Sequence, residues 1–181
     1  ISLKFPKHDI SSLRICVYSD ASFASNYDMT SQLAFILFIT DKYNKCSCIH
    51  WNSYKSARVT RSELGAEVYA FCDAMDMAIA LRIELKSILK RDIPIYMFTD
   101  SKSLFDTITS VSQVAEKRLL IDITSVRQTY MNGEITNVGW IPREYNVADQ
   151  LTKEAKNATL YQALYAGILQ HPIGQWIIHE A

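Results

Sequence analysis

The sequence predicts an α/β protein with a five-stranded mixed sheet, whose first three strands are antiparallel and whose faces are flanked by helices. β-Branched and aromatic residues gather in five short runs, which is the pattern of strands. Stretches with apolar residues at three- and four-residue spacing lie between the later runs and predict helices. At 181 residues, with 49% hydrophobic and 21% charged residues, the chain can bury the core of one domain.

The first three expected strands follow one another without a helix between them. They span residues 13–19, 33–40 and 46–54, and the stretches that separate them, 24–31 and 41–45, are rich in turn-forming residues. Connections of this kind join antiparallel neighbours. We therefore expect one edge of the sheet to be antiparallel.

A long amphipathic helix is expected to begin near Ser62. Apolar residues recur at helical spacing up to Ile88, Thr60 or Ser62 fits the N-cap, and the helix must end before Pro94. Helices between the later strands impose parallel crossovers. The remaining expected elements are a strand at 93–99, helices at 101–109 and 116–131, the second of which is closed by Asn132-Gly133, a strand at 135–141 and a helix at 147–156.

We expect the folded domain to span residues 13–156. Residues 1–12 are interpreted as an N-terminal appendage, and the start lacks both an initiator Met and the apolar core of a signal peptide, as expected of a piece of a longer protein. Residues 157–181 are interpreted as a C-terminal extension. A docking helix within this extension is predicted by its apolar and aromatic residues: Tyr161, Leu164, Tyr165, Ile168 and Leu169.

Charge and cysteine content narrow the classes of function. The 19 basic and 19 acidic residues cancel, so any contact with a polyanion must come from local patches. No apolar run approaches the ~20 residues that cross a bilayer, and we expect no membrane association. The cysteines form no Cys-x-x-Cys pair, so buried free thiols in a reducing compartment are expected rather than a zinc site: Cys16, Cys46, Cys48 and Cys72.

Acidic residues stand at four separate places along the chain. Asp20 and Asp100 directly follow apolar runs that read as buried strands, where an unpaired carboxylate would be unfavourable. A third acid, Asp149, lies near the start of the last expected helix, and Glu63 or Glu67 lies in the first turns of the long helix. A divalent cation is an obvious partner for such carboxylates.

Each aspartate also has a simpler explanation when it is taken alone. Asp20 fits an Asx-turn, Asp100 fits a helix cap before Ser101, and Asp149 fits a favourable charge in the first turn of a helix. The ordered set favours a metal site over these separate explanations.

Four stretches of sequence, taken in order, carry a family resemblance. Over roughly residues 15–155 the chain resembles the ribonuclease H domain of copia-type LTR retrotransposons. The stretches are Val17-Tyr18-Ser19-Asp20-Ala21-Ser22-Phe23-Ala24, Thr99-Asp100-Ser101, Glu116-Lys117-Arg118-Leu119-Leu120-Ile121-Asp122-Ile123, and Trp140-Ile141-Pro142 followed by Asn146-x-Ala148-Asp149-x-Leu151-Thr152-Lys153.

The resemblance implies a ribonuclease H-like fold and an endoribonuclease that cleaves the RNA strand of RNA:DNA hybrids during reverse transcription. The implied cofactors are two Mg²⁺ ions, for which Mn²⁺ can substitute; one generates the attacking hydroxide and the other stabilises the leaving 3′ oxygen. The resemblance assigns Asp20 to both ions, Asp100 and the helix Glu to one, and Asp149 to the other.

The identity of the helix Glu is left open between two residues four positions apart, which share a helix face. Glu63 fits the Glu-Leu-x-Ala of cellular and retroviral ribonucleases H, whereas Glu67 fits the Ala-Glu of copia-type elements. We favour Glu67, because the surrounding match is copia-like.

Hybrid binding requires cations along two backbones and polar groups that sense the RNA 2′-OH. Many ribonucleases H carry a mobile His before the last Asp; residues 140–149 contain none, so Arg143, Glu144 or bulk water is expected in its place. Lys117, Arg118, Arg127 and Lys153 extend the expected basic track. The candidate nucleic-acid contacts are Asn26, Ser53, Lys55, Ser56, Arg58, Thr60, Arg61, Lys102, Ser103 and Arg143.

The resemblance also implies a setting: the C-terminal end of a Pol polyprotein, with the reverse transcriptase domain of that polyprotein as partner and residues 1–12 as the tether. We expect the isolated domain to be a monomer, and the protein to be cytoplasmic, in a virus-like particle, or nuclear. The alternative is a catalytically weak or domesticated ribonuclease H-like module that binds nucleic acid or protein. An integrase or resolvase is disfavoured by the motif around Asp149.

Overall fold

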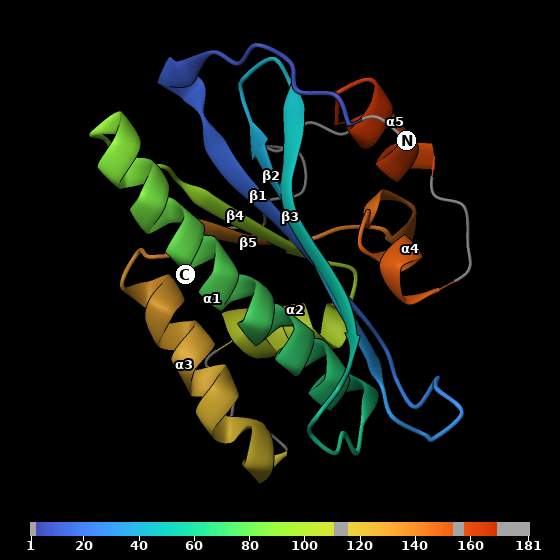
Figure 1. Ribbon diagram of the computed structural model, residues 1–181. Helices are drawn as coiled ribbons and strands as arrows, with labels where there is room; N and C mark the ends of the chain where they lie inside the picture. The colour runs from blue at the N-terminus through green and yellow to red at the C-terminus, as the bar shows by residue number, and fades with distance from the viewer. Residues whose placement is uncertain (1–2, 111–115, 154–157, 170–181) are drawn as a thin grey trace.

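The computed structural model describes residues 3–110, 116–153 and 158–169, and these build one five-stranded sheet in the order β3-β2-β1-β4-β5 (Figure 1). β2 pairs antiparallel with β1 and with β3, whereas β4 runs parallel to both β1 and β5. The predicted α/β class and the mixed sheet with three antiparallel strands are confirmed. The strands are β1 (Arg14–Ser22), β2 (Gln32–Thr40), β3 (Cys46–Lys55), β4 (Ile95–Thr99) and β5 (Asn137–Trp140).

Helices cover both faces of this sheet. In Figure 1, α1, α2 and α3 lie together on one side, and α4 and α5 lie on the other. In the part of the chain that the structure describes, no helix is both long enough and apolar enough to span a membrane. The helices are α1 (Glu63–Leu89), α2 (Lys102–Thr109), α3 (Leu120–Met131), α4 (Asp149–Thr152) and α5 (Ala158–Tyr165).

Successive side chains of β1 point to opposite faces of the sheet and belong to two separate core clusters. Ile15 and Val17 belong to the cluster under α1, α2 and α3, whereas Cys16 and Tyr18 belong to the cluster under α4 and α5. The Tyr18 ring stacks on Phe98 with 5.0 Å between the ring centroids. Because both faces of β1 are buried, it reads in the sequence as a continuous apolar run.

The start of α1 follows from a cap that the sequence predicted. Ser62 adopts extended dihedral angles, and its hydroxyl accepts a hydrogen bond from the Gly65 N–H at 3.0 Å. Ser62, rather than Thr60, is therefore the N-cap. At the other end Lys90 closes the helix in the left-handed region, with φ of 56°.

Several expected boundaries differ from the structure. β1 continues to Ser22 instead of ending at residue 19, because the antiparallel ladder with β2 continues to Gln32. The helix expected from residue 116 begins as a 3₁₀ turn at Lys117–Leu119 and becomes α-helical only at Leu120. The helix expected at 147–156 is the shorter α4, which begins at Asp149 and ends at Thr152, because Lys153 has extended dihedral angles; residues 154–156 lie outside the described residues.

The described parts of both chain ends contact the sheet domain. The Lys4 N–H donates to the Leu164 carbonyl at 2.8 Å, and the Asp9 N–H donates to an Asp41 carboxylate oxygen at 2.9 Å. α5 contributes Leu160 and Ala163 to the second core cluster. Of the residues that suggested a docking helix, Leu169 is buried and Leu164 is half-buried, whereas Tyr161, Tyr165 and Ile168 are exposed. The domain boundaries themselves stay a prediction.

Phe71 and Ile83 on α1 provide a matched test of the main core. Phe71 is fully buried, and we expect Phe71→Ala to lower the free energy of unfolding by about 3–5 kcal/mol because it leaves a cavity. Ile83 is 59% exposed, and Ile83→Ala should lower it by no more than about 1 kcal/mol. Urea unfolding followed by far-UV circular dichroism measures both; equal losses would contradict this packing.

Candidate metal-ion site

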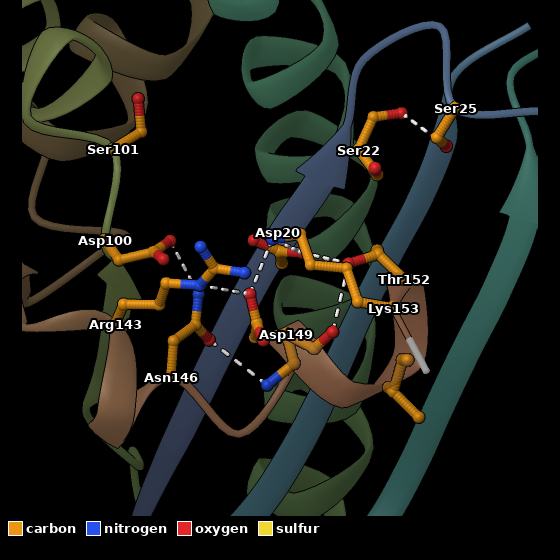
Figure 2. Close-up of polar contacts among 12 residues, drawn as sticks. Asp20, Ser22, Ser25, Asp100, Ser101, Arg143, Asn146, Asp149, Thr152 and Lys153 are labelled. Atoms are coloured by element: carbon orange, nitrogen blue, oxygen red, sulfur yellow. Dashed lines mark hydrogen bonds and ion pairs between the residues drawn. The ribbon is translucent and has the colours of Figure 1, made fainter. Parts of the chain in front are cut away.

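The acidic residues Asp20 and Asp100 are brought together by the pairing of two parallel strands. Tyr18 of β1 pairs with Phe98 of β4, so the same register two residues further along places Asp20 beside Asp100. Asp149, the first residue of α4, approaches from the face that Tyr18 and Phe98 share. One carboxylate oxygen from each aspartate lies within 4.8 Å of the other two, and Figure 2 shows the three side chains turned toward one another.

The structure does not support the separate explanations for these aspartates. Asp20 lies inside β1 rather than in a turn. The cap of α2 is Ser101, whose hydroxyl accepts from the Leu104 N–H at 3.3 Å, and not Asp100. Asp149 does lie in the first turn of a helix, but it is buried against the other two aspartates. What the three aspartates share is that their carboxylate oxygens lie close to one another.

Glu67 is the buried glutamate of α1, and its charge interacts with those of Asp20 and Asp100, although it is not one of the residues whose oxygens lie within 4.8 Å of one another. It is 5% exposed, and it accepts a hydrogen bond from the backbone N–H of Ala21 in β1. Its other oxygen, Oε2, is buried and has no hydrogen-bond partner among the described residues. Glu63, one turn earlier, is exposed. A buried carboxyl oxygen without a partner is rare, and in this position it is suited to a cation.

Burial and mutual repulsion shift the ionisation of these groups. Burial, together with the charges of Asp20 and Asp100, raises the pKa of Glu67 well above its ordinary value. Burial also raises the pKa of Asp20 to about 6, although a hydrogen bond from Thr152 and the charge of Lys153 oppose the shift. In the absence of a divalent cation, the site therefore disfavours the simultaneous ionisation of all its carboxyl groups.

Two cationic side chains partly neutralise the cluster. Arg143 Nε lies 3.0 Å from Asp149 Oδ1, and Lys153 Nζ lies 2.5 Å from the same oxygen and 3.4 Å from Asp20 Oδ2. Burial alone would lower the pKa of Lys153, but its hydrogen bond to Asp149 and the charge of Asp20 outweigh burial and raise it. Arg143, predicted to contact nucleic acid, thus lies directly at the carboxylates.

Polar residues that the sequence analysis assigned no role hold the cluster in place. Asn146 Nδ2 donates to Asp100 Oδ1 at 2.8 Å and to the Ser19 carbonyl at 2.9 Å. The Thr152 hydroxyl donates to Asp20 Oδ2, and Trp140 Nε1 donates to the Asp100 carbonyl at 3.0 Å. Asn146 and Thr152 belong to the motif around Asp149, so the motif itself was the available signal.

Candidate nucleic-acid contacts cluster around the β1–β2 loop and the end of β3. Asn26 is half-buried and donates to the Thr30 carbonyl at 3.1 Å, so it serves the loop itself. Thr60 shares a hydrogen bond of 2.5 Å with Ser31, and Ser56, which is buried, donates to a backbone carbonyl. These three residues are engaged within the protein. Ser53 is exposed and donates to the Leu151 carbonyl at 2.5 Å.

The cationic candidates are exposed, and several have acidic partners. Lys55 pairs with Asp28 at 3.0 Å, Arg58 with Asp122 at 3.3 Å, and Lys102 with Asp106 at 2.8 Å. Pairs of this kind at the surface contribute little to stability. Arg61, near the start of α1, and Ser103, beside Asp100, are also exposed. The structure thus places these side chains on the surface and does not test their contact with nucleic acid.

The raised pKa of Asp20 predicts how the stability of the metal-free protein depends on pH. The folded state holds the Asp20 proton more tightly than the unfolded state. Protonation of Asp20 therefore stabilises the folded state fully below about pH 4, and this stabilisation is lost as the pH rises through about 6. The expected loss is on the order of 3 kcal/mol. Urea unfolding in EDTA from pH 4 to 7.5 should show this loss in the free energy of unfolding of the wild type, and Asp20→Asn should lack it. Identical pH profiles for the two proteins would contradict the prediction.

Substitution with Gln tests which of the two glutamates, Glu67 or Glu63, is the metal ligand. We expect Glu67→Gln to weaken Mg²⁺ binding by at least about tenfold, a loss seen even when an outer-sphere partner is removed. Glu63→Gln should leave binding unchanged, because Glu63 is exposed and is not part of the group of close carboxylates. The Mg²⁺-dependent rise in Tm measures both variants. A loss confined to Glu63→Gln would transfer the ligand role to Glu63.

Comparison with known proteins is informative at the level of the fold. No family model matches the chain, and no curated protein is significantly similar to it. Ribonuclease H1 from the archaeon Halobacterium salinarum NRC-1 superposes with a TM-score of 0.55 at 19% identity, over 78% of this chain and 96% of that one. LC11-ribonuclease H1, isolated from compost by a metagenomic approach, superposes with a TM-score of 0.57 at 23% identity, over 81% of this chain and 98% of that one.

The structure of LC11-ribonuclease H1 in complex with an RNA/DNA hybrid gives a TM-score of 0.56 at 23% identity, over 81% of this chain and 99% of that one. These neighbours are covered almost completely, so the likeness extends over a whole domain. The predicted ribonuclease H-like arrangement of the mixed sheet and its helices is therefore confirmed, and the chain has the ribonuclease H fold.

Proposed function

We propose that this protein is a metal-dependent endoribonuclease of the ribonuclease H type, which hydrolyses the RNA strand of RNA:DNA hybrids. One observation carries the proposal: Asp20, Asp100 and Asp149 come from three separate elements and converge within 4.8 Å. Glu67, whose buried Oε2 has no hydrogen-bond partner among the described residues, interacts electrostatically with Asp20 and Asp100. Carboxylate oxygens are the ligands that hard divalent cations prefer, so the donor set fits such ions.

Two Mg²⁺ ions, or Mn²⁺ in their place, are the proposed cofactors. Asp20 would contribute to both ions, Asp100 and Glu67 to one, and Asp149 to the other. When bound, the ions would supply an activated water and stabilise charge on the leaving 3′ oxygen.

The protein's own contribution to this chemistry is positioning. β1 and β4 fix the backbones of Asp20 and Asp100 side by side, and Asn146 restrains the Asp100 carboxylate through a hydrogen bond. Thr152 restrains Asp20 in the same way. Arg143 is an exposed guanidinium at the rim of the site, and it is suited to bind a phosphate oxygen of the substrate. It is our candidate for the position that a His occupies in many ribonucleases H.

The substrate assignment rests on the fold, the acidic cluster and the surface cations. LC11-ribonuclease H1, whose structure includes an RNA/DNA hybrid, shares the fold. Lys55, Arg58 and Lys102 would exchange their acidic partners for backbone phosphates, and Arg61 would extend this track. Because surface ion pairs are weak, the exchange opposes binding only slightly. Local cations can thus bind the hybrid although the net charge is zero.

We further propose that the domain acts in retrotransposon replication, next to the reverse transcriptase of the same Pol polyprotein and with residues 1–12 as its tether. The support is the ordered set of motifs that resemble copia-type elements. In this setting the isolated domain is a monomer and works in a cytoplasmic virus-like particle or in the nucleus.

Hybrid cleavage tests the proposed activity directly. An end-labelled RNA strand is annealed to DNA and incubated with the protein and Mg²⁺, then with Mn²⁺, beside double-stranded DNA and double-stranded RNA. We expect cleavage of the hybrid alone. Asp100→Asn should reduce the rate by a factor on the order of 10² to 10³, whereas Asp76→Asn, at an exposed aspartate of α1 outside the cluster, serves as the matched control.

Cleavage that survives Asp100→Asn would contradict the assignment of the site, because the measured activity would then come from elsewhere, such as a contaminating nuclease. Hybrid binding without cleavage in either ion would favour the alternative, a ribonuclease H-like binding module.

A further inference from the structure

Lys153 occupies the space between two of the acidic side chains. Its ammonium nitrogen lies 2.5 Å from Asp149 Oδ1 and 3.4 Å from Asp20 Oδ2, so one cationic group bridges two carboxylates from different elements. Both carboxylates are buried, with side-chain exposures of 2% for Asp20 and 9% for Asp149, whereas Lys153 is 29% exposed. Figure 2 shows the Lys153 side chain together with Asp20 and Asp149.

The position of Lys153 is built into the end of α4. Asp149 and Lys153 are four residues apart, and Thr152 between them donates hydrogen bonds to Asp20 and, at 3.1 Å, to the Asp149 carbonyl. Arg143 contacts Asp149 from another element, and its side chain is 63% exposed. Lys153 is therefore the cation that contacts both Asp20 and Asp149, while Arg143 contacts Asp149 at the rim.

We infer that Lys153 is an internal counterion that must leave the carboxylates before a divalent cation can bind to both Asp20 and Asp149. The inference rests on the proposed function, because it assumes that these carboxylates are metal ligands. An ammonium and a metal ion repel each other and compete for the same two oxygens. The Lys side chain has a flexible four-carbon stem and is partly exposed, so it can move without disturbing α4.

This competition has a consequence for substrate binding. In the free protein, a divalent cation must displace an ammonium group from two buried acids, so Lys153 weakens metal binding. A nucleic-acid backbone would offer the displaced ammonium a new anionic partner. Metal ions and nucleic acid should therefore each strengthen the binding of the other, since coupling between two ligands is reciprocal.

The dissociation constant for Mg²⁺ tests the inference without any measurement of activity. Calorimetric titration of the full chain with Mg²⁺ should show roughly tenfold tighter binding for Lys153→Met and for Lys153→Gln, the gain expected when one partly buried charged contact is removed. Lys153→Arg, which keeps the positive charge, should stay close to the wild type. Lys86→Met removes an exposed lysine that pairs with Asp92 and is the matched charge control, with unchanged affinity expected.

The outcomes separate this inference from the proposed function. Mg²⁺ binding of equal strength in the wild type, Lys153→Met and Lys153→Gln would overturn the counterion role and leave the metal site intact. Weaker binding in both variants would also overturn it, because Lys153 would then support the site. An absence of Mg²⁺ binding in the wild type and all variants would overturn the proposed function itself. If Lys153→Met does not fold without metal, the more conservative Lys153→Gln provides the measurement.

Discussion

Repulsion among closely spaced carboxyl groups, of which Asp20, Asp149 and Glu67 are buried and Asp100 is half-buried, is the constraint on which this structure depends. Asp20, Asp100 and Asp149 present oxygens within 4.8 Å of one another, and Glu67 adds a buried fourth group. Such a cluster is unfavourable by itself, because burial and like charges both oppose ionisation. The fold keeps it only by fixing the backbones on which it stands: two paired parallel strands and the helices α1 and α4. Cations must supply the remaining stabilisation, and Lys153 and Arg143 do so in part.

The segment from Asn146 to Lys153 connects the rigid sheet to the chemistry proposed for the site. Asn146 joins the ends of β1 and β4 through Ser19 and Asp100, and its side-chain oxygen accepts from the Ala148 N–H at 3.1 Å, where α4 begins. Four residues of helix then suffice to place Asp149, Thr152 and Lys153 around Asp20. Buried side chains of the second core cluster, including Val147 and Ala148, anchor this segment to the sheet. A short helix is thus positioned by packing and by hydrogen bonds rather than by its own stability.

Most of the fold could be predicted from the sequence because the patterns are local. Strands buried on both faces read as apolar runs, and the start of α1 follows from the Ser62 cap. Asp20 and Asp100 stood out because each follows an apolar run. The choice between Glu63 and Glu67 could not be made from spacing, because both lie on one helix face and only packing against β1 distinguishes them. The contacts of Asn146 with Ser19 and Asp100, and those of Thr152 and Lys153 with Asp20, join residues far apart in sequence, which no local pattern encodes. The 3₁₀ turn before α3 was missed for a related reason, since apolar spacing does not separate 3₁₀ from α geometry over one turn.

The proposed function requires that the converging carboxyl groups bind divalent cations. Anomalous diffraction from crystals of this chain soaked in Mn²⁺ would test it most directly, because it locates the ions without reference to activity. We expect anomalous peaks at about 2.2 Å from oxygens of Asp20, Asp100, Asp149 and Glu67, with the Lys153 ammonium moved away from Asp20 and Asp149. A fully soaked crystal with no peak at these residues, or with a peak held by Glu63 in place of Glu67, would contradict it.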